Sequence, residues 1–134
     1  MPLPSLYDIL APLMPTDNAH QSTAARELER RVNAGFAPTD VLDLGCGVGD
    51  SVDLFRRILP ESRWVGVDIA QSPEVQQRRR HDAEFVTFDG VELPFSAARF
   101  DLVYTHQVFE HVRHPAALLI HTCRVLKPGG LLVG

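Results

Sequence analysis

The stretch that decides the fold is VLDLGCGVGD, residues 41 to 50. It is a short apolar run that carries one acid, Asp43, and continues into three glycines at alternate positions. The apolar residues are typical of a parallel strand that is covered on both faces. Each glycine removes a Cβ where the backbone must turn tightly or let a ligand approach closely. The stretch therefore predicts a buried strand that breaks into a nucleotide-binding turn and then enters a helix.

The spacing of the glycines separates two kinds of nucleotide-binding turn. A dinucleotide fingerprint, G-x-G-x-x-G, requires glycine or alanine at the position that Asp50 occupies here. From Asp43 to Gly49 the chain instead reads D-x-G-x-G-x-G. This spacing disfavours a dehydrogenase, while a glycine-rich turn that binds no ligand stays open as an alternative.

Length and composition exclude several classes of protein. A chain of 134 residues can form one domain with its own core and needs no disulfides, so we expect a single domain over residues 1–134. A net charge of -4 indicates no basic surface for nucleic acid. We find neither a signal-peptide pattern nor a long apolar run in the sequence, so we predict no membrane span. Cys46 and Cys123 form no C-x-x-C pair, which favours a reducing, cytoplasmic location.

Apolar periodicity predicts strands and helices in alternation along the chain. Four prolines divide residues 1–17 into a lead-in segment that we expect near the mouth of the cofactor site. Three arginines at 78–80 favour a cation cluster at the end of a helix over a phosphate site. The predicted strands cover 41–44, 64–68, 84–88, 100–104 and 131–133, and the predicted helices cover 22–34, 51–59, 72–80, 105–112 and 114–125.

Acids at the ends of the strands indicate where a ligand would bind. Asp68 lies 19 residues after Gly49, close to the distance at which Rossmann-like folds present a carboxylate to a ribose. A strand-end aspartate that caps the next turn is the alternative. Right-handed crossovers and acids that converge at one switch point predict an α/β fold, a doubly wound parallel sheet with strand order 3-2-1-4-5.

Five motifs in order are DLGCGVG, GVDIA, DGVELPF, FDLVYTHQVFEHV and RVLKPGG. Over about residues 20 to 134 this series resembles the class I S-adenosylmethionine-dependent methyltransferases, in the ubiquinone-biosynthesis-like, methyltransferase type 11 group. The resemblance implies a Rossmann-like sheet, S-adenosylmethionine as cofactor and a small-molecule methyl acceptor. That family normally adds a helix and an antiparallel hairpin after the fifth strand. Because this sequence stops at Gly134, we expect an incomplete C-terminus and self-association at an exposed strand edge.

The resemblance also implies a set of cofactor-binding residues. The glycine turn would hold the methionyl portion with backbone groups, Asp43 would lie near its ammonium group, and Asp68 would take the ribose. The segment that begins at Asp89 and the carbonyl of His106 would meet the adenine. The full set is Asp43, Gly45, Cys46, Gly47, Gly49, Asp68, Ile69, Asp89, Gly90, Val91 and His106.

Catalysis is expected to need little from side chains. Methyl transfer from a sulfonium is an in-line displacement, so positioning of the nucleophile supplies much of the rate and no catalytic residue is predicted. If the acceptor must lose a proton, His111 or His106 is the nearest candidate base. A helix-end histidine bonded to backbone is an equal interpretation of His111. A metal site is not expected, since these two histidines would point about 140° apart on a helix. A cofactor-binding module without catalysis, acting as a partner or regulatory domain, is the alternative function.

Overall fold

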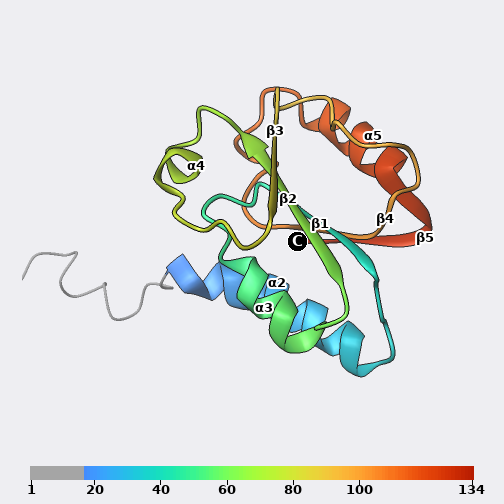
Figure 1. Cartoon of the computed structure of the whole chain (residues 1–134). Coiled ribbons are helices and arrows are strands. Elements are labelled where there is room, and N and C mark those ends of the chain that lie inside the picture. The colour runs from blue at the N-terminus through green and yellow to red at the C-terminus, as the bar shows by residue number, and fades with distance from the viewer. Residues whose placement is uncertain (1–16) are drawn as a thin grey trace, which may run out of the picture.

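The computed structural model describes residues 17–134, so nearly all of the lead-in predicted over residues 1–17 lies outside the described residues. Helices and strands alternate along most of the described chain (Figure 1). In order they are α2 (Asp17–Asn33), β1 (Asp40–Leu44), α3 (Ser51–Ile58), β2 (Arg63–Ile69), α4 (Pro73–Gln77), β3 (Glu84–Phe88), β4 (Phe100–Thr105), α5 (Pro115–Val125) and β5 (Leu126–Val133).

The strands form one parallel sheet in the order β3-β2-β1-β4-β5, as the sequence predicted. The first strand lies at its centre, with Leu42 opposite Val65 of β2 and Val103 of β4. The chain runs outward from β1 to one edge and then crosses back to build the other edge. The carboxyl ends of β1, β2 and β4 therefore meet at a switch point, where open α/β sheets bind their ligands.

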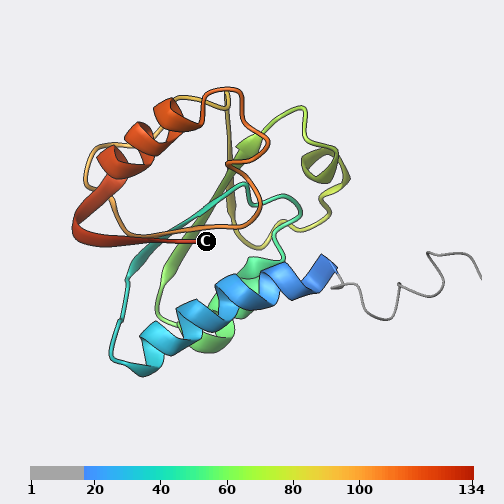
Figure 2. The same cartoon turned by 180° about the vertical axis from the view of Figure 1, so that it is seen from behind.

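Helices cover both faces of the sheet. In two opposite views α2 and α3 lie together on one face, and α5 lies on the other (Figures 1 and 2). Because side chains alternate along a strand, Val41 packs in the cluster under α2 and α3, whereas Leu42 and Leu44 pack in the cluster under α5. Phe55 and Phe100 are almost completely buried in these two clusters. The strand that leads to the glycine turn is thus enclosed on both faces.

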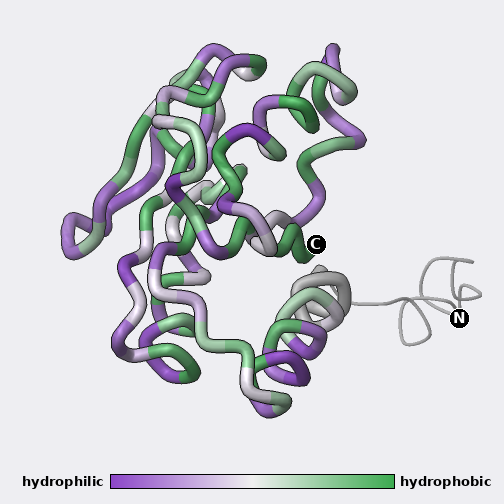
Figure 3. Tube along the Cα trace, turned by 90° about the vertical axis from the view of Figure 1, so that its right-hand side faces the viewer, coloured by the Kyte–Doolittle hydropathy of each residue, from purple (hydrophilic) through white to green (hydrophobic). Residues whose placement is uncertain are grey.

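The helix predicted over residues 22–34 begins earlier, at Asp17, and ends at Asn33. Leu28 on its buried side is fully enclosed, and hydrophobic and hydrophilic stretches alternate along the helix turns (Figure 3). Gly35, with φ of 101°, turns the chain out of the helix as predicted.

The prediction of a short helix over residues 105–112 is wrong. Thr105 is the last residue of β4, and residues 106–112 form bends and turns before α5. Gln107 has φ of 51°, a left-handed conformation that a right-handed helix cannot include. The next helix starts only at Pro115.

Two other boundaries differ from the sequence prediction. Strand β5 begins at Leu126 instead of Leu131, and its pairing with β4 shifts register between Phe100 and Leu102. Helix α4 has the predicted serine cap, because Val75 N–H donates to Ser72 Oγ, but it ends at Gln77. The predicted cation cluster at a helix end is therefore wrong. The arginines follow the helix, where two of them bind carbonyl oxygens of the glycine turn.

Candidate functional site

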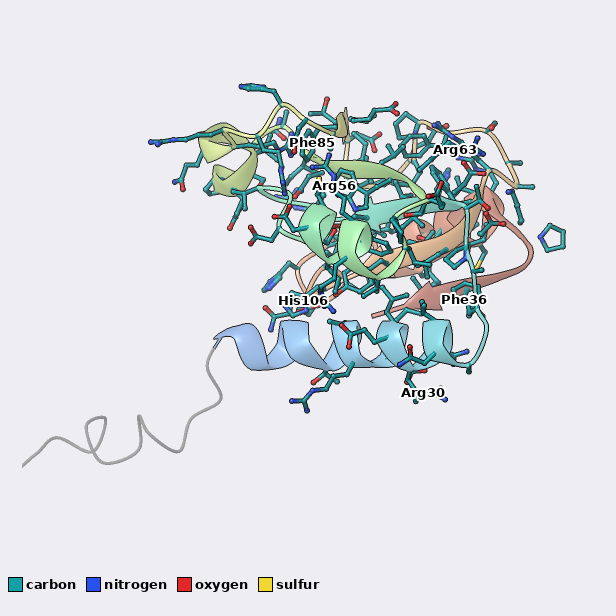
Figure 4. The ribbon with its side chains drawn as sticks, turned by 60° about the horizontal axis from the view of Figure 1, so that its bottom comes forward. Arg30, Phe36, Arg56, Arg63, Phe85 and His106 are labelled. Atoms are coloured by element: carbon teal, nitrogen blue, oxygen red, sulfur yellow. The ribbon has the colours of Figure 1, made fainter. Side chains whose placement is uncertain are left out.

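A cavity of about 780 Å³ opens at the carboxyl ends of β1, β2 and β4. In Figure 4 His106, which directly follows β4, lies to the left of Phe36 and Arg63, which precede β1 and begin β2. Most of the lining comes from the glycine turn and α3, from the end of β2 with the start of α4, and from the end of β4 with the loop after it. Helix α2 contributes Ala25. The cavity thus occupies the switch point of the sheet.

The glycine turn continues directly from β1 and is fastened to β2. The amides of Gly45 and Cys46 both donate to the carbonyl of Val67, at 2.8 Å and 3.2 Å. Gly45 has φ of 78°, and a Cβ at this position would overlap the side chain of Val108 in the loop after β4. Glycine is therefore required here by backbone conformation and by the close approach of that loop.

Asp43 is a buried carboxyl group at the inner wall of the cavity, with only 5% of its surface exposed. The Ser51 hydroxyl donates to Asp43 Oδ2 at 2.5 Å, and Trp64 Nε1 donates to the same hydroxyl at 2.9 Å. Burial raises the pKa of Asp43 to about 7, because it outweighs the opposing effect of the Ser51 hydrogen bond, and Asp68 and Asp50 add to the rise. A cationic group that enters the cavity would stabilise the ionised form of this carboxyl.

Asp68 ties the glycine turn to the end of β2. Its Oδ2 accepts from the amide of Gly47 and its Oδ1 from the amide of Ile69, each at 2.8 Å. Its side chain also lines the cavity. The alternative role of a strand-end aspartate that organises a turn is therefore present in the structure. It leaves the predicted contact with a ribose possible, because each carboxylate oxygen can accept a second hydrogen bond.

The cavity brings together six of the eleven residues predicted to bind the cofactor. These six are Asp43, Cys46, Gly47, Asp68, Ile69 and His106. Gly45 and Gly49 belong to the glycine turn but are not among the residues that line the cavity. The segment after β3, Asp89 to Val91, lies beyond the cavity wall: the Asp89 carboxylate accepts from the amides of Val91 and Glu92, which lowers its pKa. A Cβ on Gly90 would be 3.6 Å from Ile69, so this segment adjoins the rim.

Several lining residues were missed by the sequence analysis. Tyr104 pairs in register with Asp43, and its ring meets Phe55 edge-on at 5.5 Å. Burial raises the pKa of Tyr104 to about 12, so its hydroxyl stays protonated. The parallel pairing of β1 and β4 was a signal that could have located this residue. Gln107 had no such signal, because its position depends on the irregular loop after β4.

The outer part of the cavity is lined by His106, Gln107 and His111. The His111 side chain is 76% exposed, and its Nε2 lies 3.9 Å from a carboxylate oxygen of Glu110. Among the side chains of residues 23–134, no group of three or more histidines, cysteines, aspartates or glutamates is arranged to hold a metal ion. The chemistry available at this end of the cavity is hydrogen bonding and proton transfer by imidazole.

Comparison with known proteins identifies the family. Residues 42–134 match the methyltransferase domain family, and this range includes the last three residues of β1, the glycine turn and the four other strands of the sheet. The chain belongs to this methyltransferase family. The resemblance found in the sequence is therefore confirmed, and the methyltransferase fold predicted from it is the fold observed.

Individual methyltransferases are similar to this chain in sequence. Trans-aconitate 2-methyltransferase from Azoarcus sp. is 37% identical over 114 residues, which cover 84% of this chain and 44% of the relative. Demethylmenaquinone methyltransferase from Thermotoga maritima is 34% identical over 97 residues, 72% of this chain and 42% of the relative. The chain thus spans less than half the length of these two curated relatives.

A solved structure supports the cofactor. The 1,6-didemethyltoxoflavin-N1-methyltransferase of Burkholderia thailandensis, with bound S-adenosylhomocysteine, is 26% identical, has a TM-score of 0.66, and aligns over 87% of this chain and 51% of its own. S-adenosylmethionine is the cofactor of this methyltransferase domain. The residues present fit it, because the cavity combines a buried carboxyl for an ammonium group with a strand-end carboxylate for hydroxyl groups.

Proposed function

We propose that this methyltransferase domain transfers a methyl group from S-adenosylmethionine to a small-molecule acceptor. The observation that carries the proposal is the convergence of the glycine turn, Asp43 and Asp68 on one cavity at the switch point of the sheet. The cavity extends past these residues to the loop after β4, which leaves room for a second molecule. That extension favours an enzyme over a module that only binds the cofactor.

The inner part of the cavity is the proposed cofactor site. The cofactor supplies an electrophilic methyl group on a sulfonium. Asp43 would pair with its ammonium group, and Asp68 would accept from its ribose hydroxyls. The segment Asp89 to Val91 lies at the rim beside Ile69, and we propose that it contacts the adenine.

The outer part of the cavity is the proposed acceptor site. His106, Gln107 and His111 line it, together with the buried ring of Tyr104. Their main contribution would be to place the nucleophilic atom of the acceptor in line with the methyl group. For an acceptor that must lose a proton, we propose His106 or His111 as the base.

The chemical identity of the acceptor is proposed only as a class. The names of the three similar methyltransferases specify trans-aconitate, demethylmenaquinone and didemethyltoxoflavin, which are all small molecules. No helix among those of residues 17–134 is long and apolar enough to cross a membrane. The names of these three relatives support a small organic acceptor, which is the class that we propose for this chain.

Binding and turnover test the proposal separately. Calorimetric titration of the purified chain should show binding of S-adenosylhomocysteine and no comparable binding of NAD. Transfer of a labelled methyl group from S-adenosylmethionine to a panel of small carboxylates, quinols and heterocycles should then identify the acceptor class. A His111→Gln variant should lower turnover on an acceptor that ionises and leave S-adenosylhomocysteine affinity unchanged. Equal binding of NAD, or no binding of S-adenosylhomocysteine, would refute the proposed function.

We also propose that a second copy of the chain pairs with the outer edge of β5. This strand is an edge of the sheet within residues 17–134, and Leu132 on it is 39% exposed. An edge strand presents backbone donors and acceptors that a second strand can pair with. Sedimentation should show dimers that form with rising concentration and that are weakened by Leu132→Lys. A chain that stays monomeric at all concentrations would contradict this.

A further inference from the structure

The outer side of the glycine turn, facing away from the cavity, is held by two arginines that follow α4. Arg78 donates from Nε and Nη2 to the carbonyl oxygen of Gly47, at 2.9 Å and 2.7 Å. Arg80 donates from Nη1 to the carbonyl oxygen of Gly49 at 2.9 Å. Arg79, between them in sequence, is exposed to solvent. Two alternate arginines therefore bind two alternate carbonyls of the turn.

Both arginines are themselves fixed by neighbouring elements. The guanidinium carbon of Arg78 lies 3.9 Å from the ring centroid of Phe85 on β3. Arg80 binds both carboxylate oxygens of Asp53 on α3, at 2.7 Å and 3.2 Å, and donates to Asp82 at 2.8 Å. Only 21% of its side chain is exposed. The carbonyls of the turn are thus connected to β3 through the cation–π contact of Arg78 and to α3 through the charge-assisted hydrogen bonds of Arg80.

The direction of these carbonyls determines where two amides point. In a trans peptide the N–H points away from the C=O of the same unit, and the described chain contains no cis peptide. With the carbonyls of Gly47 and Gly49 directed at the arginines, the amides of Val48 and Asp50 are directed to the opposite side of the turn. Both of these residues line the cavity.

The amides of the turn divide into two groups. Those of Gly45, Cys46, Gly47 and Gly49 donate to partners within the protein. Within residues 17–134 the amides of Val48 and Asp50 donate to no protein group. Two unused donors therefore belong to residues of the cavity wall, on the side away from the arginines.

We propose that Arg78 and Arg80 are positioning residues that aim the amides of Val48 and Asp50 at the carboxylate of the methionyl group of the cofactor. The inference rests on the proposed cofactor site. A turn with three glycines has many accessible backbone conformations, and ordering it upon binding would weaken affinity. By fixing two carbonyls beforehand, the arginines hold the donors in place before the ligand arrives. Amide donors to a carboxylate are charge-assisted and depend on such alignment.

The test compares two ligands that differ in the amino-acid end, which carries the carboxylate and the ammonium group. S-adenosylhomocysteine carries it, whereas 5′-methylthioadenosine keeps the adenosine and sulfur but lacks the amino-acid end. Arg78→Ala and Arg80→Ala should each weaken S-adenosylhomocysteine binding by about 10- to 100-fold, the usual range for lost hydrogen bonds to a charged group. Their affinity for 5′-methylthioadenosine should stay within about twofold of wild type, since changes away from a contact are usually small. Arg79→Ala is the matched control and should change neither affinity.

The conservative variants Arg78→Lys and Arg80→Lys keep the test decisive if an alanine variant does not fold. Each retains the charge but not the planar fork, so S-adenosylhomocysteine affinity should fall to a value between those of wild type and the alanine variant. Equal losses for both ligands would show a merely structural role and overturn the inference. Unchanged affinity for S-adenosylhomocysteine would also overturn it. Failure of the wild-type chain to bind S-adenosylhomocysteine would instead refute the proposed function.

Discussion

Replacing Asp43 by asparagine should change how the stability of the protein depends on pH. Burial raises the pKa of this carboxyl from its ordinary value of 3.8 to about 7 in the folded state. The folded protein therefore keeps a proton on Asp43 that the unfolded chain releases. The resulting stabilisation is fully present below about pH 4 and is lost as the pH rises through about 7. Asparagine cannot ionise, and its carbonyl oxygen can still accept from Ser51.

The size of the effect follows from the two pKa values. Between pH 5 and pH 8 the ionisation of Asp43 should lower the free energy of unfolding of the wild-type protein by about 2.5 kcal/mol. The Asp43→Asn variant should lack this loss. Asp40, Asp53, Asp82 and Asp101 have lowered pKa values, so they stay ionised in this window and add no slope. All other groups are common to both proteins and cancel in the difference.

Urea unfolding of both proteins at pH 5, 6, 7 and 8 measures this difference. The variant should gain stability relative to wild type at each step, by about 2.5 kcal/mol over the whole range. Ligand binding provides a second readout, because the affinity of the wild-type protein should increase with pH while its stability decreases. Wild-type affinity for S-adenosylhomocysteine should rise with pH as Asp43 becomes able to pair with the ammonium group, whereas the variant should bind weakly throughout. Parallel stability curves for the two proteins would refute the assignment of a raised pKa to Asp43.

Three further changes test other parts of the structure. Asp68→Ala should weaken S-adenosylhomocysteine binding by about 1–3 kcal/mol in calorimetry, because it removes the acceptor of the Gly47 amide as well as the proposed ribose partner; an unchanged affinity would contradict both roles. Gly45→Ala should destabilise the protein by at least about 1–2 kcal/mol, since its φ is 78° and its new methyl would overlap Val108. Adding Val108→Ala should recover part of that loss in urea unfolding, and no recovery would argue against the overlap. Phe100→Ala should cost about 3–5 kcal/mol of unfolding free energy, because the ring is almost fully buried against Phe95, and a loss below about 1 kcal/mol would show that the site collapses around it.

Much of the fold could be predicted from local patterns. The apolar run at 41–44 and the glycines after it are sufficient to indicate a central strand and a tight turn, because few other structures tolerate that composition. Acids at strand ends and right-handed crossovers then limit the sheet to the order that is observed. Asp43 and Asp68 could be predicted to lie at the cavity for the same reason, since parallel strands bring their carboxyl ends to one edge.

The remaining features depend on contacts that no local pattern encodes. Arg78 lies 31 residues from the carbonyl that it binds, so the sequence around it indicated only a helix end. Gln107 takes a left-handed conformation in a segment whose composition predicted a helix. The raised pKa of Asp43 comes from its burial, which outweighs the opposing effect of the Ser51 hydrogen bond. Sequence alone determined the strands, the turn and the acids, because these follow from the chemistry of neighbouring residues. The tertiary structure decided the partners, conformations and proton affinities, because these depend on which distant groups packing brings together.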